Sequence, residues 1–140
     1  MKILIAVDGS EYTQRMLDFV TSHRKLFDES HEYTVLTAVP AVPPRASSII
    51  DKETLAGYYA EEAEKVLKPI REYLATHSLK ASVAHKVGPP GEVISKTATA
   101  GGYELILMGS HGHSALGKLV MGSVTTNVLA HCGVPVLLVR

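Results

Sequence analysis

Five short apolar runs are spaced along this chain, and each is followed or preceded directly by a glycine, a proline or an aspartate. They cover residues 3–7, 33–39, 81–87, 105–108 and 134–139. Several of these runs are continuous rather than alternating, which is typical of strands buried on both faces of a parallel sheet. The sequence therefore predicts five parallel strands, several of them buried on both faces.

The segments between these runs carry apolar residues at helical spacing. Met16, Val20 and Phe27 fall on one face of a predicted helix. Residues 59–74 repeat the pattern, which Pro69 interrupts, and we expect this proline to bend the helix. Shorter helices are predicted over residues 91–100 and 123–131. Strands that alternate with helices indicate an α/β fold: a single open parallel five-stranded sheet with right-handed crossovers and helices on both faces.

The length of 140 residues suits one domain, and one such sheet accounts for residues 1–140. The least regular stretch is residues 40–50, where three prolines precede small polar residues. It is interpreted as a mobile surface loop that could lie over a ligand.

Composition narrows the partners that we expect. Fourteen Lys and Arg balance fourteen Asp and Glu, so no net charge would attract nucleic acid or an anionic membrane surface. No apolar run approaches the length of about 20 residues that spans a bilayer. The lone Cys132 cannot form an internal disulfide, and the amino-terminal run reaches Asp8 before any signal-peptide core is complete. We therefore expect a cytoplasmic protein with no nucleic-acid partner and no membrane insertion.

Ligands of open α/β sheets bind beyond the carboxyl ends of the strands, which makes the loops after the first and fourth strands candidates. The first loop contains Asp8, Gly9 and Ser10. Ser10 is predicted to cap the following helix. Asp8 has two interpretations of equal weight: a turn or capping residue, or a hydrogen-bond acceptor for a ribose hydroxyl or a base amine.

The loop after the fourth strand is rich in glycine, with four in the fifteen residues 109–123. Glycine lets the backbone approach a ligand closely, and consecutive amides can form a nest for an anion. Gly122 and Ser123 then open a helix, whose free amides favour a phosphate. The alternative is a flexible loop in which Ser123 only caps its own helix. A P-loop is rejected because Leu119 stands where the Mg²⁺-binding hydroxyl would be.

The spacing Gly109-x₂-Gly112-x₉-Gly122-Ser123 resembles the universal stress protein family, in the subgroup that keeps this motif and binds ATP. Two further segments agree with the family and extend the resemblance over essentially the entire chain: Ile5-Ala6-Val7-Asp8-Gly9-Ser10 and Gly88-x-Pro90-x₃-Ile94. The resemblance implies the Rossmann-type fold of the adenine nucleotide alpha hydrolases and ATP as the ligand, with any Mg²⁺ held by the phosphates.

The resemblance also implies a role for individual residues. The adenosine moiety would contact Ala6, Asp8, Val39, Met108 and Gly109, with Val39 offering main-chain groups to adenine. The phosphates would contact Gly112, Gly122, Ser123 and Val124. We expect no catalytic residue and no metal site formed by protein side chains.

Three functions are compatible with the sequence. The first is an ATP-binding regulatory module in a stress response, with a protein partner that the sequence does not identify. The second is a slow ATP hydrolase, for which Asp8 and His111 are the nearby titratable groups. The third is a dimeric interaction protein with incidental nucleotide, and the family resemblance implies a homodimer formed through the last strand, residues 136–139, as an exposed sheet edge.

Overall fold

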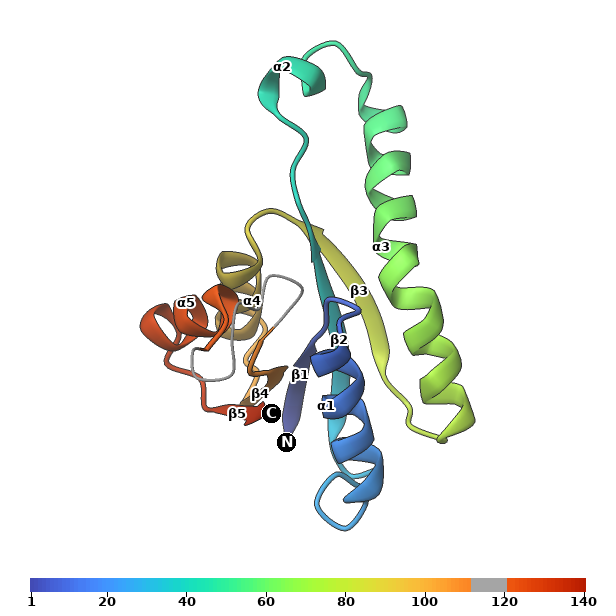
Figure 1. The fold of residues 1–140 in the computed structure, drawn as a ribbon, viewed down its shortest axis with the longest axis vertical. Coiled ribbons are helices and arrows are strands. Elements are labelled where there is room, and N and C mark those ends of the chain that lie inside the picture. Colours follow the sequence, from blue (N-terminus) through green and yellow to red (C-terminus); the bar gives the residue numbers. More distant parts are fainter. Residues whose placement is uncertain (112–120) are drawn as a thin grey trace.

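The computed structural model describes residues 1–111 and 121–140 of the chain. Its five strands form one parallel sheet in the order β3-β2-β1-β4-β5 (Figure 1). The strands are β1 Lys2–Ala6, β2 Glu32–Val39, β3 Ser82–Val87, β4 Leu105–Gly109 and β5 Val136–Val139. The predicted parallel α/β fold is confirmed, and each strand lies within two residues of the range read from the sequence.

Within residues 1–111 and 121–140, four helices of two or more turns connect the strands: α1 Glu11–Ser22, α3 Lys52–Thr76, α4 Pro90–Ala100 and α5 Ser123–His131. Ser10 caps α1 as predicted, since its Oγ accepts from the Thr13 amide at 3.4 Å. Helix α3 is continuous through Pro69. Asp51 caps the start of α3, where its side chain accepts from the Thr54 amide at 2.7 Å.

Helix α1 is shorter than its apolar pattern indicated. It ends at Ser22, because the amide of His23 bonds to the carbonyls of Phe19 and Val20 and the ring Nδ1 of His23 lies 2.7 Å from the Phe19 carbonyl oxygen. These contacts satisfy carbonyl groups that a further turn would have used. Phe27 therefore lies in the following turn, yet it is 1% exposed and packs in the same core as the helix.

The helices cover both faces of the sheet, and alternate residues of each strand contact different pairs of helices. On one face, Ile3 and Ile5 pack against α1 and α3. On the other face, Leu4 and Ala6 pack against α4 and α5. Alternate residues of β1 and β2 therefore face the space between the sheet and α4.

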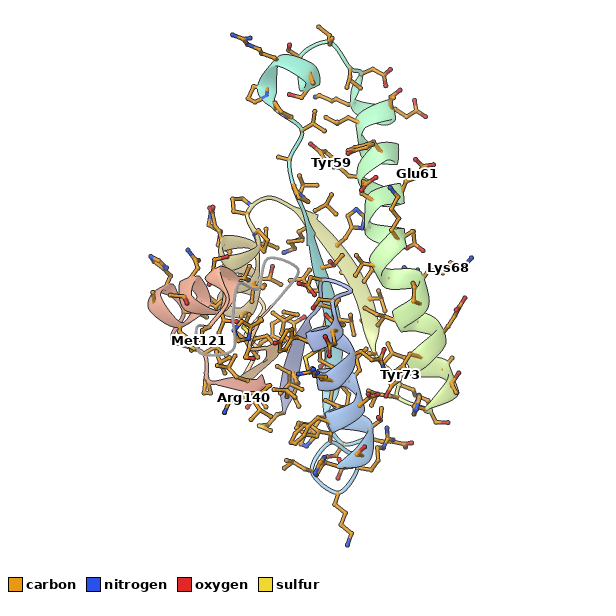
Figure 2. All side chains as sticks on the ribbon, viewed as in Figure 1. Tyr59, Glu61, Lys68, Tyr73, Met121 and Arg140 are labelled. Atoms are coloured by element: carbon orange, nitrogen blue, oxygen red, sulfur yellow. The ribbon has the colours of Figure 1, made fainter. Side chains whose placement is uncertain are left out.

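Residues 40–62 project from the end of the sheet at which β2 finishes (Figures 1 and 2). The predicted loop contains a short helix, α2 Pro44–Ser47, which begins with proline at its first position. The Val42 amide donates to the Tyr59 hydroxyl at 2.9 Å and so ties the two sides of this projection together. Ile49 near its tip is 85% exposed. Among the residues described, no helix has both the length and the apolar character needed to cross a membrane.

Candidate ligand site at the strand ends

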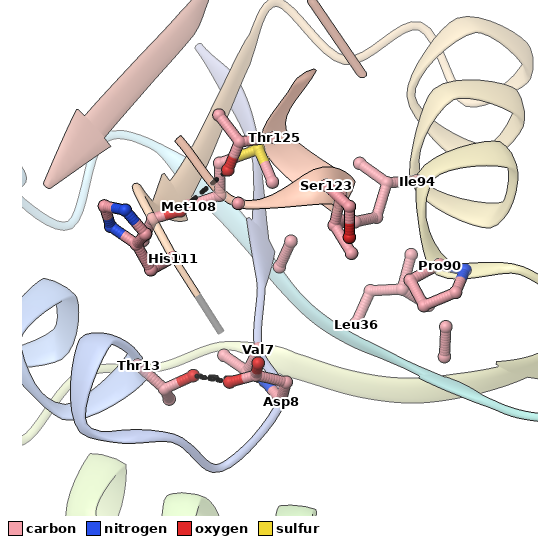
Figure 3. A pocket seen from close by; sticks show the side chains of 15 residues that line it. Val7, Asp8, Thr13, Leu36, Pro90, Ile94, Met108, His111, Ser123 and Thr125 are labelled. Atoms are coloured by element: carbon pink, nitrogen blue, oxygen red, sulfur yellow. Dashed lines mark hydrogen bonds between the residues drawn. The ribbon is translucent and has the colours of Figure 1, made fainter. Parts of the chain in front are cut away.

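A cavity of about 260 Å³ opens at the carboxyl ends of β1 and β4, on the face of the sheet that α4 and α5 cover (Figure 3). Because β1 and β4 are neighbours and their outgoing connections run to opposite faces of the sheet, this is the switch point at which α/β proteins bind ligands. The lining is mostly apolar and comes from the strand ends, the start of α4 and the start of α5: Ala6, Val7, Asp8, Thr13, Leu36, Ala38, Pro90, Ile94, Met108, Gly109, His111, Gly122, Ser123, Val124 and Thr125.

Most of the residues expected to bind ligand line this one cavity. They are Ala6, Asp8, Met108, Gly109, Gly122, Ser123 and Val124. Gly112, also expected there, lies outside the described residues. Within the described range 40–50, no residue lines the cavity.

Val39 does not line the cavity. Its side chain is 4% exposed and packs in the core on the opposite face of the sheet, and its carbonyl accepts from the Gly88 amide at 2.9 Å. Leu36 and Ala38 line the cavity from the same strand. Alternation along β2 places Leu36 and Ala38 on the face opposite to that of Val39. The register that pairs Leu36 with Ala6 shows that this face is the one that Ala6 occupies.

The carboxylate of Asp8 is held at the end of β1 by the first turn of α1. Its Oδ1 accepts from the Ser10 amide at 2.9 Å and from the Thr13 hydroxyl at 2.9 Å. Gly9 between them has a φ of +75°, which favours glycine at this turn. One strand away, the buried Thr37 hydroxyl donates to the Val7 carbonyl at 2.9 Å. Both threonines thus fix the chain where it leaves β1.

The start of α5 is not capped by a side chain, because its N-cap residue is Gly122. Ser123 is the first helical residue, so it does not cap its own helix. The amides of Ser123, Val124 and Thr125 precede the first intrahelical bond, and within residues 1–111 and 121–140 none of them donates a hydrogen bond to the protein. The Gly122 amide is different, since it donates to the Ser110 carbonyl at 2.9 Å. Three amide donors therefore remain at a helix start that lines the cavity.

Two further contacts set the position of this helix start. The Thr125 hydroxyl, on a residue 2% exposed, donates to the Gly109 carbonyl at 3.1 Å. The Ser110 amide donates to the Val139 carbonyl at 2.9 Å. The end of β4 is thus bonded both to α5 and to β5.

His111 adds an aromatic group at the edge of the cavity. Its ring centroid lies 4.9 Å from that of Tyr12, at an interplanar angle of 39°. The Arg15 guanidinium lies 5.0 Å from the centroid of the same Tyr12 ring. Gly109 fits below Tyr12, because a Cβ atom at Gly109 would lie 2.7 Å from the Tyr12 Cβ. The helix and strand therefore approach closely at this point.

Among the described residues, no group of three or more His, Cys, Asp and Glu side chains could hold a metal ion. The site offers an apolar wall, one carboxylate and a set of amide donors. This combination defines the class: an open α/β domain with a small-molecule site at its topological switch point.

Comparison of the sequence and the fold with those of known proteins identifies the family within that class. Residues 1–140 match the model of the universal stress protein family, and the chain belongs to that family. Universal stress protein MJ0577 of Methanocaldococcus jannaschii is 39% identical over 80 residues, which cover 57% of this chain and 49% of the relative. Its solved structure superposes on 99% of this chain and 94% of that chain, with a TM-score of 0.80 and 31% identity.

Two other relatives match along nearly the whole of this chain. Slr1230 of Synechocystis is 33% identical over 140 residues, which cover 99% of this chain and 42% of the relative. YxiE of Bacillus subtilis is 27% identical over 147 residues, which cover 99% of this chain and 98% of the relative. The alignments thus span less than half of the first two relatives and almost all of the third.

Proposed function

We propose that this chain binds an adenine nucleotide, ATP, and acts as a nucleotide-binding regulatory module in a stress response. The observation that carries the proposal is the start of α5, where the amides of Ser123, Val124 and Thr125 stand uncapped beside the cavity. Amides at a helix start, together with the positive end of the helix dipole, bind phosphate groups. Gly112, which lies outside the described residues, is proposed to belong to the same phosphate site.

The rest of the cavity suits the nucleoside. Ala6, Leu36 and Met108 form part of an apolar wall that would pack against a flat base. Asp8 lies at the edge of this wall and accepts hydrogen bonds, so it would bind a ribose hydroxyl or a base amine. Amide donors suit an anion rather than a metal, and we propose that any Mg²⁺ is held by the phosphates.

Structures of the same fold support an adenine nucleotide as the ligand class. A universal stress protein from Archaeoglobus fulgidus was solved in complex with dAMP, and a family protein from Arabidopsis thaliana with AMP bound. These chains are 20% and 13% identical to this one, and they superpose with TM-scores of 0.70 and 0.69. They support the idea that this fold can hold such ligands.

Two measurements test the proposal. The first identifies by mass any nucleotide that the purified protein retains. The second is calorimetric titration with ATP, ADP, AMP and adenosine, in which we expect saturable binding that tightens as phosphates are added. Ala38→Leu, which adds bulk to the cavity wall, should abolish binding, whereas Ala60→Leu on the exposed surface of α3 should not. A wild-type protein that does not saturate at millimolar ATP would show the proposal to be wrong.

We propose further that two copies pair through β5. It is an edge strand of four apolar, half-buried residues. Because Pro135 and Val139 direct their carbonyls to β4, the backbone groups of Val136 and Leu138 point away from the sheet. Val136→Pro removes one outward amide without breaking the ladder to β4, so it should convert a dimer to a monomer in sedimentation. A wild-type monomer at micromolar concentration, with and without ATP, would contradict the pairing.

We also propose a cytoplasmic location. The single Cys132 is not paired with another cysteine of the chain, as is usual where thiols are kept reduced. Fractionation of cells that express a tagged chain tests this, and recovery with an extracytoplasmic fraction would contradict it.

A further inference from the structure

The hydroxyl of Thr13, which lines the cavity, makes two hydrogen bonds to Asp8, the residue proposed to bind the nucleoside. Thr13, in the first turn of α1, donates its hydroxyl proton to the Asp8 Oδ1 at 2.9 Å. The same oxygen accepts from the Asp8 main-chain amide at 3.1 Å. The hydroxyl therefore bridges the backbone and the carboxylate of a single residue. Figure 3 shows the bond to the carboxylate.

Thr13 is itself held firmly. It is 5% exposed, and it belongs to the helix whose residues Met16, Leu17 and Val20 are at most 1% exposed in the core. Burial among these residues gives the Thr13 side chain a fixed position relative to the sheet. The position of the Asp8 carboxylate is therefore fixed by a residue anchored in the core as well as by its own turn.

The geometry points to Thr13 as a positioning residue: its hydroxyl sets the Asp8 carboxylate in the direction from which it accepts a hydrogen bond from the nucleoside. This role rests on the proposed nucleotide function. The Ser10 amide donates to the same Asp8 Oδ1, and the Thr13 hydroxyl adds a second, buried contact that orients the carboxylate in advance. A carboxylate oriented in this way binds a donor without ordering itself first, which favours affinity for the ligand. Thr13 thus acts through Asp8, and we assign it no separate ligand contact.

A double-mutant cycle tests the role, because it measures whether two residues act on the ligand together. ATP affinity is measured by calorimetry for the wild type, Thr13→Val, Asp8→Ala and the double variant. We expect Thr13→Val to weaken ATP binding about tenfold, which corresponds to about 1.4 kcal/mol. In the Asp8→Ala background, the same substitution should change the affinity no further.

Three additional variants separate positioning from stability. Thr13→Ser loses the methyl group but keeps the hydroxyl, so it should bind ATP within about twofold of the wild type. This result would assign the effect of Thr13→Val to the hydroxyl and not to packing. Thr21→Val removes another partly buried hydroxyl of α1, which contacts Tyr73, and should leave ATP affinity unchanged. Thr13→Ala replaces Thr13→Val if the isosteric variant unfolds, and thermal melting confirms that each protein is folded.

The outcomes distinguish the two proposals. A wild-type protein that binds ATP, with Thr13→Val binding equally well, would overturn the role of Thr13 alone. An equal loss from Thr13→Val with and without the Asp8 carboxylate would also overturn it, because Thr13 would then act independently. A wild-type protein that does not bind ATP would overturn the nucleotide function and this role with it.

Discussion

Proline at position 123 is a sharp test of the phosphate site, because it removes one amide donor from α5 and leaves the helix itself intact. The Ser123 amide takes no part in the intrahelical ladder. The preceding residue, Gly122, has φ −61° and ψ 156°, a conformation that a residue before proline readily adopts. Pro89 has φ −59° and ψ 129° ahead of Pro90, which begins α4 in the same way. Ser123→Pro should therefore fold with little loss of stability.

The loss of affinity follows from the number of donors. Ser123→Pro removes one of three amides that face the proposed phosphates, and a hydrogen bond to a charged group contributes about 1.5–3 kcal/mol. ATP binding should weaken about 10- to 100-fold. Adenosine, which has no phosphate, should bind as tightly as it binds to the wild type. The matched control Ser123→Ala keeps the amide and loses only the hydroxyl.

Calorimetric titration of the three proteins with ATP and with adenosine measures both effects. The reasoning fails if ATP binds to Ser123→Pro as it binds to the wild type, since the amide would then not contact the phosphates. It also fails if adenosine weakens as much as ATP, because the substitution would then have altered the cavity and not the anion site.

The remaining predictions concern stability. Gly109→Ala should cost about 1–3 kcal/mol in urea unfolding, because the new Cβ meets the Tyr12 backbone and Cβ; Gly133→Ala, with nothing within 4 Å, is its control and should change little. Leu107→Ala should cost about 2–5 kcal/mol, since the side chain is fully buried in a central strand, and a smaller loss would mean that the core collapses around the gap. Burial raises the pKa of Tyr33 above its ordinary value of 10.0, so the folded state binds this proton more tightly than the unfolded state. Stability should then fall as the pH rises past about 10, and an equally steep fall in Tyr33→Phe would contradict this.

The strands β1, β2 and β4 could be predicted because burial on both faces imposes continuous apolar runs, and those runs ended at turn residues. The edge strands β3 and β5 are more exposed, and their ends were marked by Gly88 and Gly133. The order of the strands could not be predicted, because any run that is apolar throughout fits any place in the sheet. The end of α1 was missed for a local reason. Phe27 keeps the helical spacing and is buried, but His23 ends the helix by bonding to its last carbonyls.

The residues of the candidate site that lie in loops could be predicted from the sequence, whereas the strand residues that form its walls could not. Asp8, Gly122 and Ser123 stand at strand and helix ends, where chemistry-bearing residues are visible in a sequence. Leu36 and Ala38 are ordinary strand residues, and only the pairing of β2 with β1 shows that they share a face with Ala6. Thr13 gave no signal because a threonine in the first turn of a helix is common.

The placement of β1 between β2 and β4 bears on how the domain is synthesised. During synthesis β1 emerges well before β4, which pairs with it, and before the amide donors at the start of α5. A nascent chain that stops before β4 has one side of β1 unpaired and only the Asp8 half of the cavity. The proposed nucleotide ligand would therefore stabilise the complete sheet but not its precursors, and its binding would report that β4 and α5 have joined the sheet.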